Sequence, residues 1–394
     1  MAKLIEITGK ALSGEWGSED ENGIGIPILR TTNFTNEGVI NYNNVVTRII
    51  TKKNISEKYL RKGDIIIEKS GGSDKQPVGR VVYYDGLDNT YLFNNFTALL
   101  RVKNQKIWVP RYVFYALLKN YRQGGTIPFE NKTTGLHNLK IDAYINNFKI
   151  NETPINIQQK ICVILDKIQG IIRVRKQQLI DFDTLIKARF VEMFGDPISN
   201  PKDWVFVGLL ELGQCKNGMN FHTDDSGVEV HCLGVGDFKD KAVISDTSVL
   251  SLISLNEMPS EEYLLQDGDI VFVRSNGNKA LVGRCLAVYP GQVKTTFSGF
   301  CIRFRKNSDK ITTEYLVHVL KTESMRNRMQ GRGANIQNLN QQILRALPVP
   351  VPPVDLQNEF AAFVTQVDKS KSVIQKSLKE TQLLFDSLMQ EYFG

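Results

Sequence analysis

Residues 154–195 read PINIQQKICVILDKIQGIIRVRKQQLIDFDTLIKARFVEMFG, and this stretch decides the fold of the chain. From residue 157 to residue 194 it holds no proline and a single glycine, Gly170. Its apolar residues recur at spacings of three and four, which is typical of a helix that buries one face. The spacing therefore predicts one continuous helix, roughly 60 Å long at a rise of 1.5 Å per residue.

A helix of that length cannot bury its apolar stripe against one small domain, so it needs a partner. The expected stripe has two parts, separated by a polar interruption near Arg175. It comprises Ile157, Ile161, Ile164, Ile168, Ile171, Leu179, Phe182, Leu185, the aliphatic stem of Arg189, and Met193.

The same stretch returns at residues 353–394, where the expected stripe comprises Leu356, Phe360, Phe363, Val367, Ile374, Leu378, Leu384, Leu388 and Tyr392. Other segments return too. Lys62-Gly63-Asp64-Ile65-Ile66 matches Asp267-Gly268-Asp269-Ile270-Val271, and Val78-Gly79-Arg80 matches Val282-Gly283-Arg284. A repeat of roughly 200 residues is domain-sized. The chain is therefore an internal pseudo-twofold repeat, and double-stranded DNA is a natural partner with two related halves.

Each repeat has a strand-rich front before its long helix. Short β-type runs separated by Gly, Asn and Asp predict strands, and one short helix follows them in each front. The expected strands cover 26–30, 64–68 and 79–84, then 230–233, 269–273 and 283–288, and the short helices cover 112–118 and 315–320. The fold class is α+β. We expect domains at 1–153 and 198–352, with long helices at 154–197 and 353–394.

Two long helices of matched length in one chain favour pairing within that chain. A compact pseudo-twofold arrangement would make them an antiparallel coiled coil that separates the two domains. The alternative is that each helix pairs with a helix of another molecule.

Bulk composition narrows the function further. The formal net charge is +7 and the isoelectric point is about 9.0, which favours an anionic partner. No apolar run approaches 18 residues and no signal-peptide pattern opens the chain, so we expect a soluble, cytoplasmic protein without a membrane partner. The cysteines form no C-x-x-C pair, which indicates neither a zinc site nor a disulfide framework. They are Cys162, Cys215, Cys232, Cys285 and Cys301.

The order of domain and helix, in duplicate, resembles the specificity subunit of type I restriction-modification systems. Two further segments carry the resemblance: the proline-rich run Leu347-Pro348-Val349-Pro350-Val351-Pro352-Pro353 and the preceding Gly333-Ala334-Asn335-Ile336-Gln337-Asn338-Leu339. The first repeat departs from this pattern, with a single proline in Asn151-Glu152-Thr153-Pro154.

The resemblance implies two target recognition domains, each for one half of a split DNA sequence. It implies that the helices act as a spacer and as a docking surface for two modification (adenine methyltransferase) subunits, with restriction subunits joining the complex. It also implies a chain without catalysis or cofactor of its own. S-adenosylmethionine, ATP and magnesium would be bound by the partner subunits.

Catalytic motifs point the same way. The sequence contains no Asn-Pro-Pro-aromatic tetrapeptide and no P-loop. Glu130-Asn131-Lys132 has the spacing of a metal-dependent nuclease, but such a site also needs an aspartate on a preceding strand, and the second repeat has no equivalent of this tripeptide. Gly234-Val235-Gly236-Asp237-Phe238 could suggest a cofactor loop, yet a turn or a close backbone approach to DNA fits it better. The scattered histidines 137, 222, 231 and 318 form no motif.

Three loops in each repeat carry residues suited to DNA. Arg and Lys match guanine, Asn matches adenine, and hydroxyl or cationic groups hold phosphates. The first loop follows residues 67 and 273, the second follows residues 29 and 233, and the third includes 131–134 and 332–335. The predicted DNA-binding residues are Arg30, Thr31, Asn33, Lys69, Ser70, Lys75, Arg80, Lys132, Arg274, Ser275, Asn276, Lys279, Arg284 and Arg332. Because these loops differ between the repeats, we expect an asymmetric target.

Two other functions stay open at this level. The chain could be a self-contained DNA-modifying enzyme, or a coiled-coil scaffold that binds proteins only. We predict no catalytic residues and no metal ligands in this chain.

Overall fold

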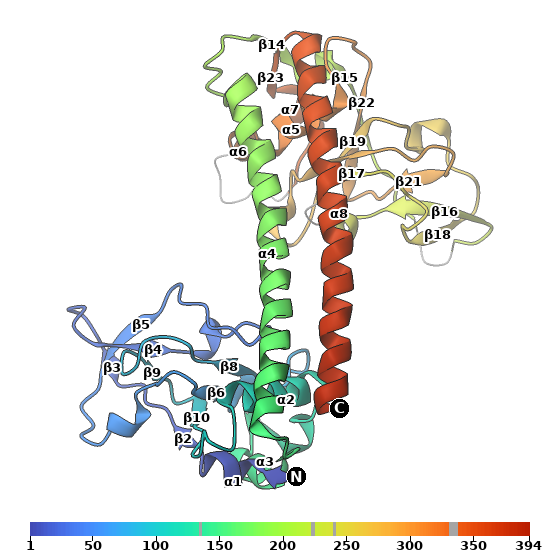
Figure 1. Cartoon of the computed structure of the whole chain (residues 1–394). Helices are drawn as coiled ribbons and strands as arrows, with labels where there is room; N and C mark the ends of the chain where they lie inside the picture. Colours follow the sequence, from blue (N-terminus) through green and yellow to red (C-terminus); the bar gives the residue numbers. More distant parts are fainter. Residues whose placement is uncertain (134–135, 222–224, 239–241, 331–337) are drawn as a thin grey trace. The chain divides into compact units, whose positions relative to one another are not determined.

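The computed structural model describes residues 1–133, 136–221, 225–238, 242–330 and 338–394 (Figure 1). The chain divides into two units of comparable size. The first unit is Met1–Lys176 with Lys376–Gly394, and the second is Gln177–Gln375. Both boundaries fall inside the long helices α4 (Ile155–Phe194) and α8 (Val354–Phe393), each of 40 residues. Each unit therefore contains the start of one long helix and the end of the other.

The globular part of the first unit mixes short strands with short helices. Its helices are α1 (Leu4–Thr8), α2 (Pro110–Arg122) and α3 (Ile141–Asn147). Its strands are β1 (Ala2–Lys3), β2 (Leu12–Ser13), β3 (Ser18–Glu19), β4 (Ile26–Leu29), β5 (Val46–Ile49), β6 (Ile65–Glu68), β7 (Ser70–Gly72), β8 (Val81–Tyr83), β9 (Leu92–Phe93), β10 (Thr97–Leu100), β11 (Glu130–Thr133), β12 (Leu136–Leu139) and β13 (Lys149–Ile150).

The second unit repeats this plan. Its helices are α5 (Thr313–Lys321), α6 (Glu323–Gln330) and α7 (Gln341–Arg345). Its strands are β14 (Val205–Gly208), β15 (Gly213–Asn217), β16 (Val228–Leu233), β17 (Val243–Ile244), β18 (Leu252–Leu255), β19 (Asp269–Val273), β20 (Cys285–Val288), β21 (Thr295–Phe297), β22 (Cys301–Lys306) and β23 (Pro348–Val351).

Strand order shows the duplication directly. The sheet β2-β10-β6-β8 of the first unit corresponds to β15-β22-β19-β20 of the second, which adds β17 at its edge. The parallel pair β4–β9 corresponds to the parallel pair β16–β21. The pairs β1–β13 and β14–β23 close the base of each unit. The predicted α+β class with an internal repeat is confirmed.

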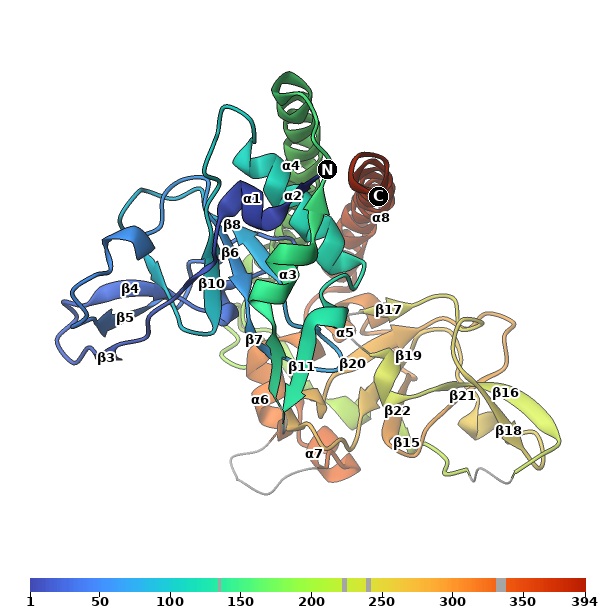
Figure 2. The same ribbon diagram turned by 90° about the horizontal axis from the view of Figure 1, so that it is seen from below.

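The central strands are apolar on both faces because each separates two cores. In β6, Ile65 and Ile67 face a core shared with α2 and α4, whereas Ile66 faces a core shared with β4 and β9. In β19, Ile270 and Phe272 face the helical core, and Val271 faces the other. Figure 2 shows β3, β4 and β5 on one side of the sheet that contains β6, β8 and β10. Continuous apolar runs are the expected pattern for strands buried on both faces.

The repeated Gly-Asp pairs of the sequence hold the start of these central strands. Asp64 is buried and forms a bidentate pair with Arg101, with N–O distances of 2.7 and 2.6 Å. Asp269 forms the same pair with Arg305, at 2.8 and 2.7 Å. A buried carboxylate needs such a partner, since an unpaired buried charge is very costly.

The two long helices pack side by side and antiparallel within each unit. In the second unit, Asp183 pairs with Lys371 at 2.7 Å, while Arg189, further along α4, pairs with Glu359, which lies earlier on α8, at 2.9 Å. In the first unit, the Arg175 guanidinium donates to the Ser377 carbonyl at 2.9 Å. Within each unit the two long helices therefore pair antiparallel inside one chain.

The predicted apolar stripe of α4 was wrong in part. The buried residues are Ile161, Leu165, Ile168 and Ile172 in the first unit and Ile186, Phe190 and Met193 in the second. The predicted members Ile157, Ile164, Ile171 and Leu185 are exposed. On α8, Leu384 is exposed and the next residue, Phe385, takes the buried position. The helix carries apolar residues on two adjacent faces, and spacing alone does not tell which face packs inward.

A buried glutamine fixes the start of each long helix. Gln158 accepts a hydrogen bond from the Val109 amide at 2.8 Å and donates to the carbonyls of Ile107 and Thr153 at 2.9 and 2.7 Å. Gln357 accepts from the Thr312 amide at 2.8 Å and donates to Lys310 and Pro352 at 2.9 and 2.8 Å. Each amide thus joins the helix to the loop before α2 or α5, which explains the repeated Pro-x-x-x-Gln.

Replacing Gln357 with leucine is expected to lower the free energy of unfolding by about 3 kcal/mol, because buried backbone groups lose their partners. Urea denaturation followed by circular dichroism measures this change. Gln366→Leu, at an exposed position of the same helix, is the matched control. Equal midpoints for the two variants would show that the buried amide contributes no more than a surface residue.

Candidate nucleic-acid interface

A four-residue turn lies at the centre of the candidate site in each unit. In the first unit it covers residues 94–97 between β9 and β10, closed by a bond from the Thr97 amide to the Asn94 carbonyl at 3.0 Å. In the second unit it covers residues 298–301 between β21 and β22, closed from the Cys301 amide to the Ser298 carbonyl at 2.8 Å. The turn is the same, although only its third residue, phenylalanine, is shared.

This turn joins the first and second predicted loops of the first unit. The Asn94 amide donates to the Leu29 carbonyl at 2.9 Å, at the start of the second loop. The Phe96 carbonyl accepts from the Lys69 and Ser70 amides at 2.8 and 3.1 Å, at the start of the first loop. The two loops therefore meet at the ends of β4 and β6.

The second unit repeats these bonds one by one. The Ser298 amide donates to the Leu233 carbonyl at 3.0 Å. The Phe300 carbonyl accepts from the Arg274 and Ser275 amides at 2.8 and 3.3 Å. Loops that are separated in sequence thus form one edge in each copy.

Residues a few positions after the third predicted segment join the same edge, whereas residues 332–335 of that segment lie outside the described residues. The Leu139 amide donates to the Lys69 carbonyl at 2.8 Å, and β12 pairs with β7 so that Asn138 lies opposite Ser70. In the second unit the Leu339 amide donates to the Arg274 carbonyl at 2.8 Å, and Asn338 forms a β-bridge with Ser275. We call the turn together with these three segments the three-loop edge.

Glycines allow the backbone to pack closely behind the turn. A Cβ atom on Gly14 would lie 2.1 Å from the Asn94 carbonyl oxygen, and one on Gly218 would lie 2.0 Å from the Ser298 carbonyl oxygen. No larger residue fits without moving the backbone. The turn is therefore held from behind by a strand and from both sides by loops, which makes it a rigid support for exposed side chains.

Residues 2–181 and 201–382 each match the type I restriction modification DNA specificity domain. The chain belongs to this family. As a specificity subunit, it recognises DNA sequence with two domains, one in each repeat.

Relatives and solved structures agree with this assignment. The StySPI specificity subunit of Salmonella potsdam is 25% identical over 395 residues, covering 93% of this chain and 80% of the relative. The EcoKI specificity subunit of Escherichia coli K12 is 23% identical over 391 residues, with the same two shares covered. The S subunit from M. genitalium has the same fold, with a TM-score of 0.56 at 15% identity over all of this chain and 95% of that one.

The predicted residues of the first loop in this specificity subunit lie on the three-loop edge. Lys69 is half-buried and donates to the Ser13 hydroxyl at 2.9 Å. Burial, followed by the nearby charge of Lys58, lowers the pKa of Lys69 below its ordinary value. The Ser70 hydroxyl donates to Asn138 Oδ1 at 2.6 Å, and Lys75 is exposed.

Two predicted residues of the first unit have internal roles. Arg80 pairs with the buried Glu68 through two bonds of 3.0 Å and donates to the carbonyls of Phe34 and Thr31 at 3.3 and 3.2 Å. Burial opposes its charge, but the hydrogen bonds and charge of Glu68 prevail and raise the pKa of Arg80. The side chain of Asn33 is buried, accepts from the Arg30 amide at 2.9 Å and donates to Asn41 and Asn43 carbonyls. Both residues therefore shape the second loop from inside.

The remaining residues of the second loop lie nearer the surface. Arg30 is half-buried and donates to the Asn44 carbonyl at 3.1 Å. Thr31 is half-buried too, and its carbonyl is held by Arg80. The equivalent loop of the second unit is closed in the same way, since Asp237 accepts from the Gly234 amide at 2.9 Å. That glycine-rich loop is thus a short 3-10 turn, which supports the turn interpretation of the sequence.

In the second unit the first loop is more exposed. Arg274, Ser275 and Asn276 are half-buried, and Lys279 is exposed. The Arg274 guanidinium donates to the Gly299 carbonyl at 3.3 Å, and Asn276 Oδ1 accepts from the Asn278 amide at 2.8 Å. Arg284 occupies the place of Arg80.

The environment of the two equivalent arginines differs. The position that corresponds to Glu68 is Val273 in the second unit, so the carboxylate that holds Arg80 is not repeated there. Two predicted residues fall outside what the structure describes. The backbone of Lys132 lies in β11 but its side chain is not among the described parts, and Arg332 lies outside the described residues.

Sequence reasoning missed two residues of the edge, Phe96 and Phe300, which are 48% and 60% exposed. A signal was present. Each follows a buried phenylalanine, Phe93 or Phe297, by three residues. The two exposed phenylalanines are separated by the same offset as Val78-Gly79-Arg80 and its repeat.

Neither catalytic alternative finds an assembled site. Glu130 accepts from the Val78 amide at 2.7 Å and lies 3.2 Å from His137 Nδ1, so it braces β11 and β12. Among the described residues, no group of three or more His, Cys, Asp or Glu side chains could hold a metal ion. Within the same part of the chain, no helix has both the length and the apolar character needed to cross a bilayer.

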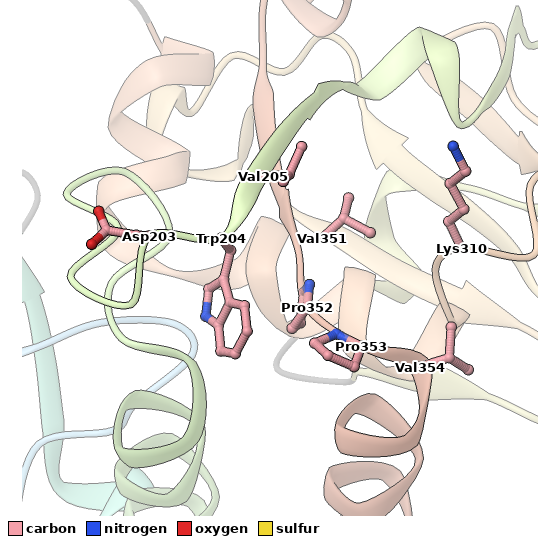
Figure 3. Close-up of a pocket in the computed structure, with 8 residues that line it drawn as sticks. All are labelled: Asp203, Trp204, Val205, Lys310, Val351, Pro352, Pro353 and Val354. Atoms are coloured by element: carbon pink, nitrogen blue, oxygen red, sulfur yellow. The ribbon is translucent and has the colours of Figure 1, made fainter.

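One pocket among the described residues lies away from the three-loop edge. It has a volume of about 420 Å³ and lies beside the start of α8 in the second unit. Figure 3 shows the Trp204 ring and Pro353 facing one space, while the Asp203 carboxylate points away from it. Its lining is mainly apolar, and its two charged residues, Asp203 and Lys310, lie on opposite sides of it without forming an assembled catalytic pair.

Proposed function

We propose that this specificity subunit recognises an asymmetric DNA target in two parts, with one three-loop edge for each part, and that it carries no catalytic group of its own. The observation that carries the proposal is the duplicated edge. Its backbone bonds are the same in both units, whereas the side chains on it differ. The same support then presents different chemistry to each half of the target.

The charges on the two edges fit DNA. Lys69 and Lys75 in the first unit, and Arg274 and Lys279 in the second, place cations on the first loop, which suits phosphates and guanine edges. Asn276 adds an amide of the kind that matches adenine. In the first unit Gly71 stands at the equivalent place and offers no amide side chain. These differences support unequal half-sites.

We propose further that the long helices dock two modification subunits and that restriction subunits join them. The support is the second apolar face of α4, which its pairing with α8 leaves open. In the first unit this face exposes Ile157, Val163, Ile164, Ile171 and Val174. Exposed apolar stripes on a helix mark protein–protein contact surfaces. S-adenosylmethionine, ATP and magnesium would then be held by those partners.

The test uses the purified full chain alone. We expect filter binding to DNA with an affinity that falls by about 100-fold or more between 50 and 200 mM salt, because phosphate contacts release counterions. We expect neither methyl transfer nor cleavage when S-adenosylmethionine and magnesium are supplied.

Each alternative gives a different result in this test. A self-contained enzyme would modify or cut DNA without partners. A scaffold for proteins would bind DNA weakly at every salt concentration and show no preference among sequences. Methylation patterns of the host genome would identify the target for the later experiments.

A further inference from the structure

Phe96 and Phe300 lie at the centre of the three-loop edge. About half of Phe96 and more than half of Phe300 are exposed to solvent. The carbonyl of each is fixed by the amides of a basic residue and a serine, as described above. Its neighbour three residues earlier, Phe93 or Phe297, is fully buried. The backbone is thus fixed, and the exposed ring projects from a rigid turn.

A half-exposed phenylalanine gains less from folding than a buried one, since most of the benefit of an aromatic side chain comes from burial. A single one needs no explanation, because scattered exposed apolar residues are normal. Here the ring stands at the same point of both units, although the first two residues of the turn have changed from Asn94-Asn95 to Ser298-Gly299. The shared element of the turn is the ring itself.

The polar residues of the edge leave one feature of DNA unrecognised. Cations, hydroxyls and amides bind phosphates and the donor and acceptor groups of bases. The 5-methyl group of thymine is the apolar marker in the major groove, and it is contacted by apolar side chains, phenylalanine included. A ring surrounded by such polar groups is suited to that contact.

We propose that Phe96 and Phe300 are specificity-determining residues, each contacting a thymine methyl group in its half of the target. The inference rests on the proposed function, because it needs the three-loop edge to face the DNA. The two phenylalanines add an apolar contact to an edge whose residues predicted from the sequence are all polar or charged.

The experiment combines protein variants with altered DNA, using the full chain and its identified target. Phe96→Ala is expected to weaken binding to the target about tenfold. Replacing thymine by deoxyuridine in the half-site read by the first unit removes the methyl group and is expected to weaken binding of the unmodified protein similarly. The two changes together should cost no more than either alone. Phe300→Ala should give the same pattern with the other half-site.

Controls separate this contact from folding and from charge. Leu87→Ala in the first unit and Phe206→Ala in the second remove exposed apolar side chains outside the edge and should leave affinity unchanged. Phe96→Leu keeps an apolar contact and should retain most of the discrimination between thymine and deoxyuridine. The salt dependence should stay the same in all variants, because no phosphate contact is lost.

Other outcomes overturn the inference. Additive losses would mean that the ring and the methyl group do not touch. If the alanine variant no longer bends the DNA but remains as sensitive to deoxyuridine as the unmodified protein, the ring instead inserts between base steps. Unchanged DNA binding would indicate a protein contact. If the unmodified protein shows no sequence preference, the proposed function fails and this inference fails with it.

Discussion

Removing residues 173–179 from α4 together with residues 372–378 from α8 is expected to shorten the preferred gap between the two half-sites by about 3 base pairs. Seven helical residues span roughly 10 Å, and base pairs are stacked about 3.4 Å apart. Seven residues also make nearly two whole turns, so the helix beyond the deletion is rotated by only about 20°. The prediction follows from the proposal that the paired helices set the spacing.

The deletion lies at the junction of the two units and removes Leu378, which packs against the core of the first unit. It spans both unit boundaries, at Lys176 on α4 and at Gln375 on α8. Arg175 and its partner Ser377 leave together, while the Asp183–Lys371 pair remains. Binding to a series of duplexes with different gaps measures the effect.

The control removes residues 173–179 alone. That change shifts the register of one helix against the other and is expected to destabilise the pair, which thermal unfolding would detect. A double deletion that folds and still prefers the original gap would show that these helices do not set the spacing.

Replacing Arg274, Ser275 and Lys279 together with alanine is expected to relax recognition of one half-site and leave the other unchanged. Each base-contacting residue contributes about 1–3 kcal/mol of discrimination, so the loss in affinity for the correct sequence should exceed tenfold. A member that contacts phosphate should instead weaken binding to all sequences alike. Replacing Lys69, Ser70 and Lys75 should have the corresponding effect on the other half-site.

Competition with duplexes altered in one half-site at a time measures both effects. Lys202→Ala with Lys310→Ala removes the same number of cations from exposed positions of the second unit. This control should weaken binding only through net charge. If either triple replacement leaves affinity and specificity unchanged, the first loop does not contact DNA.

Much of the architecture could be predicted because it depends on patterns that repeat. A proline-free run with helical spacing can hardly form anything but a helix. Its recurrence, with the same proline and glutamine at its start, revealed the internal duplication. The central strands were predictable from runs such as Ile65-Ile66-Ile67, which both faces of the sheet bury.

The details of the edge depend on which side chains the fold pairs with one another, and the spacing of residues in the sequence does not show these pairings. Arg80 looked like a DNA ligand until its pairing with Glu68 was seen. Asn33 looked like a base reader, yet its amide closes its own loop. The two apolar faces of α4 have nearly the same periodicity, so only tertiary packing selects Ile161 and Leu165 over Ile164.

The division of the chain through its long helices has a consequence for how the protein is made. Phe385 and Met389 complete the core of the first unit, although they follow the whole second domain in the sequence. During synthesis the helical core of the first domain can therefore close only after the second domain has been made. A chain that stops after the second domain would lack these two residues. Its first domain would therefore be destabilised as well, and no working half of the protein would remain.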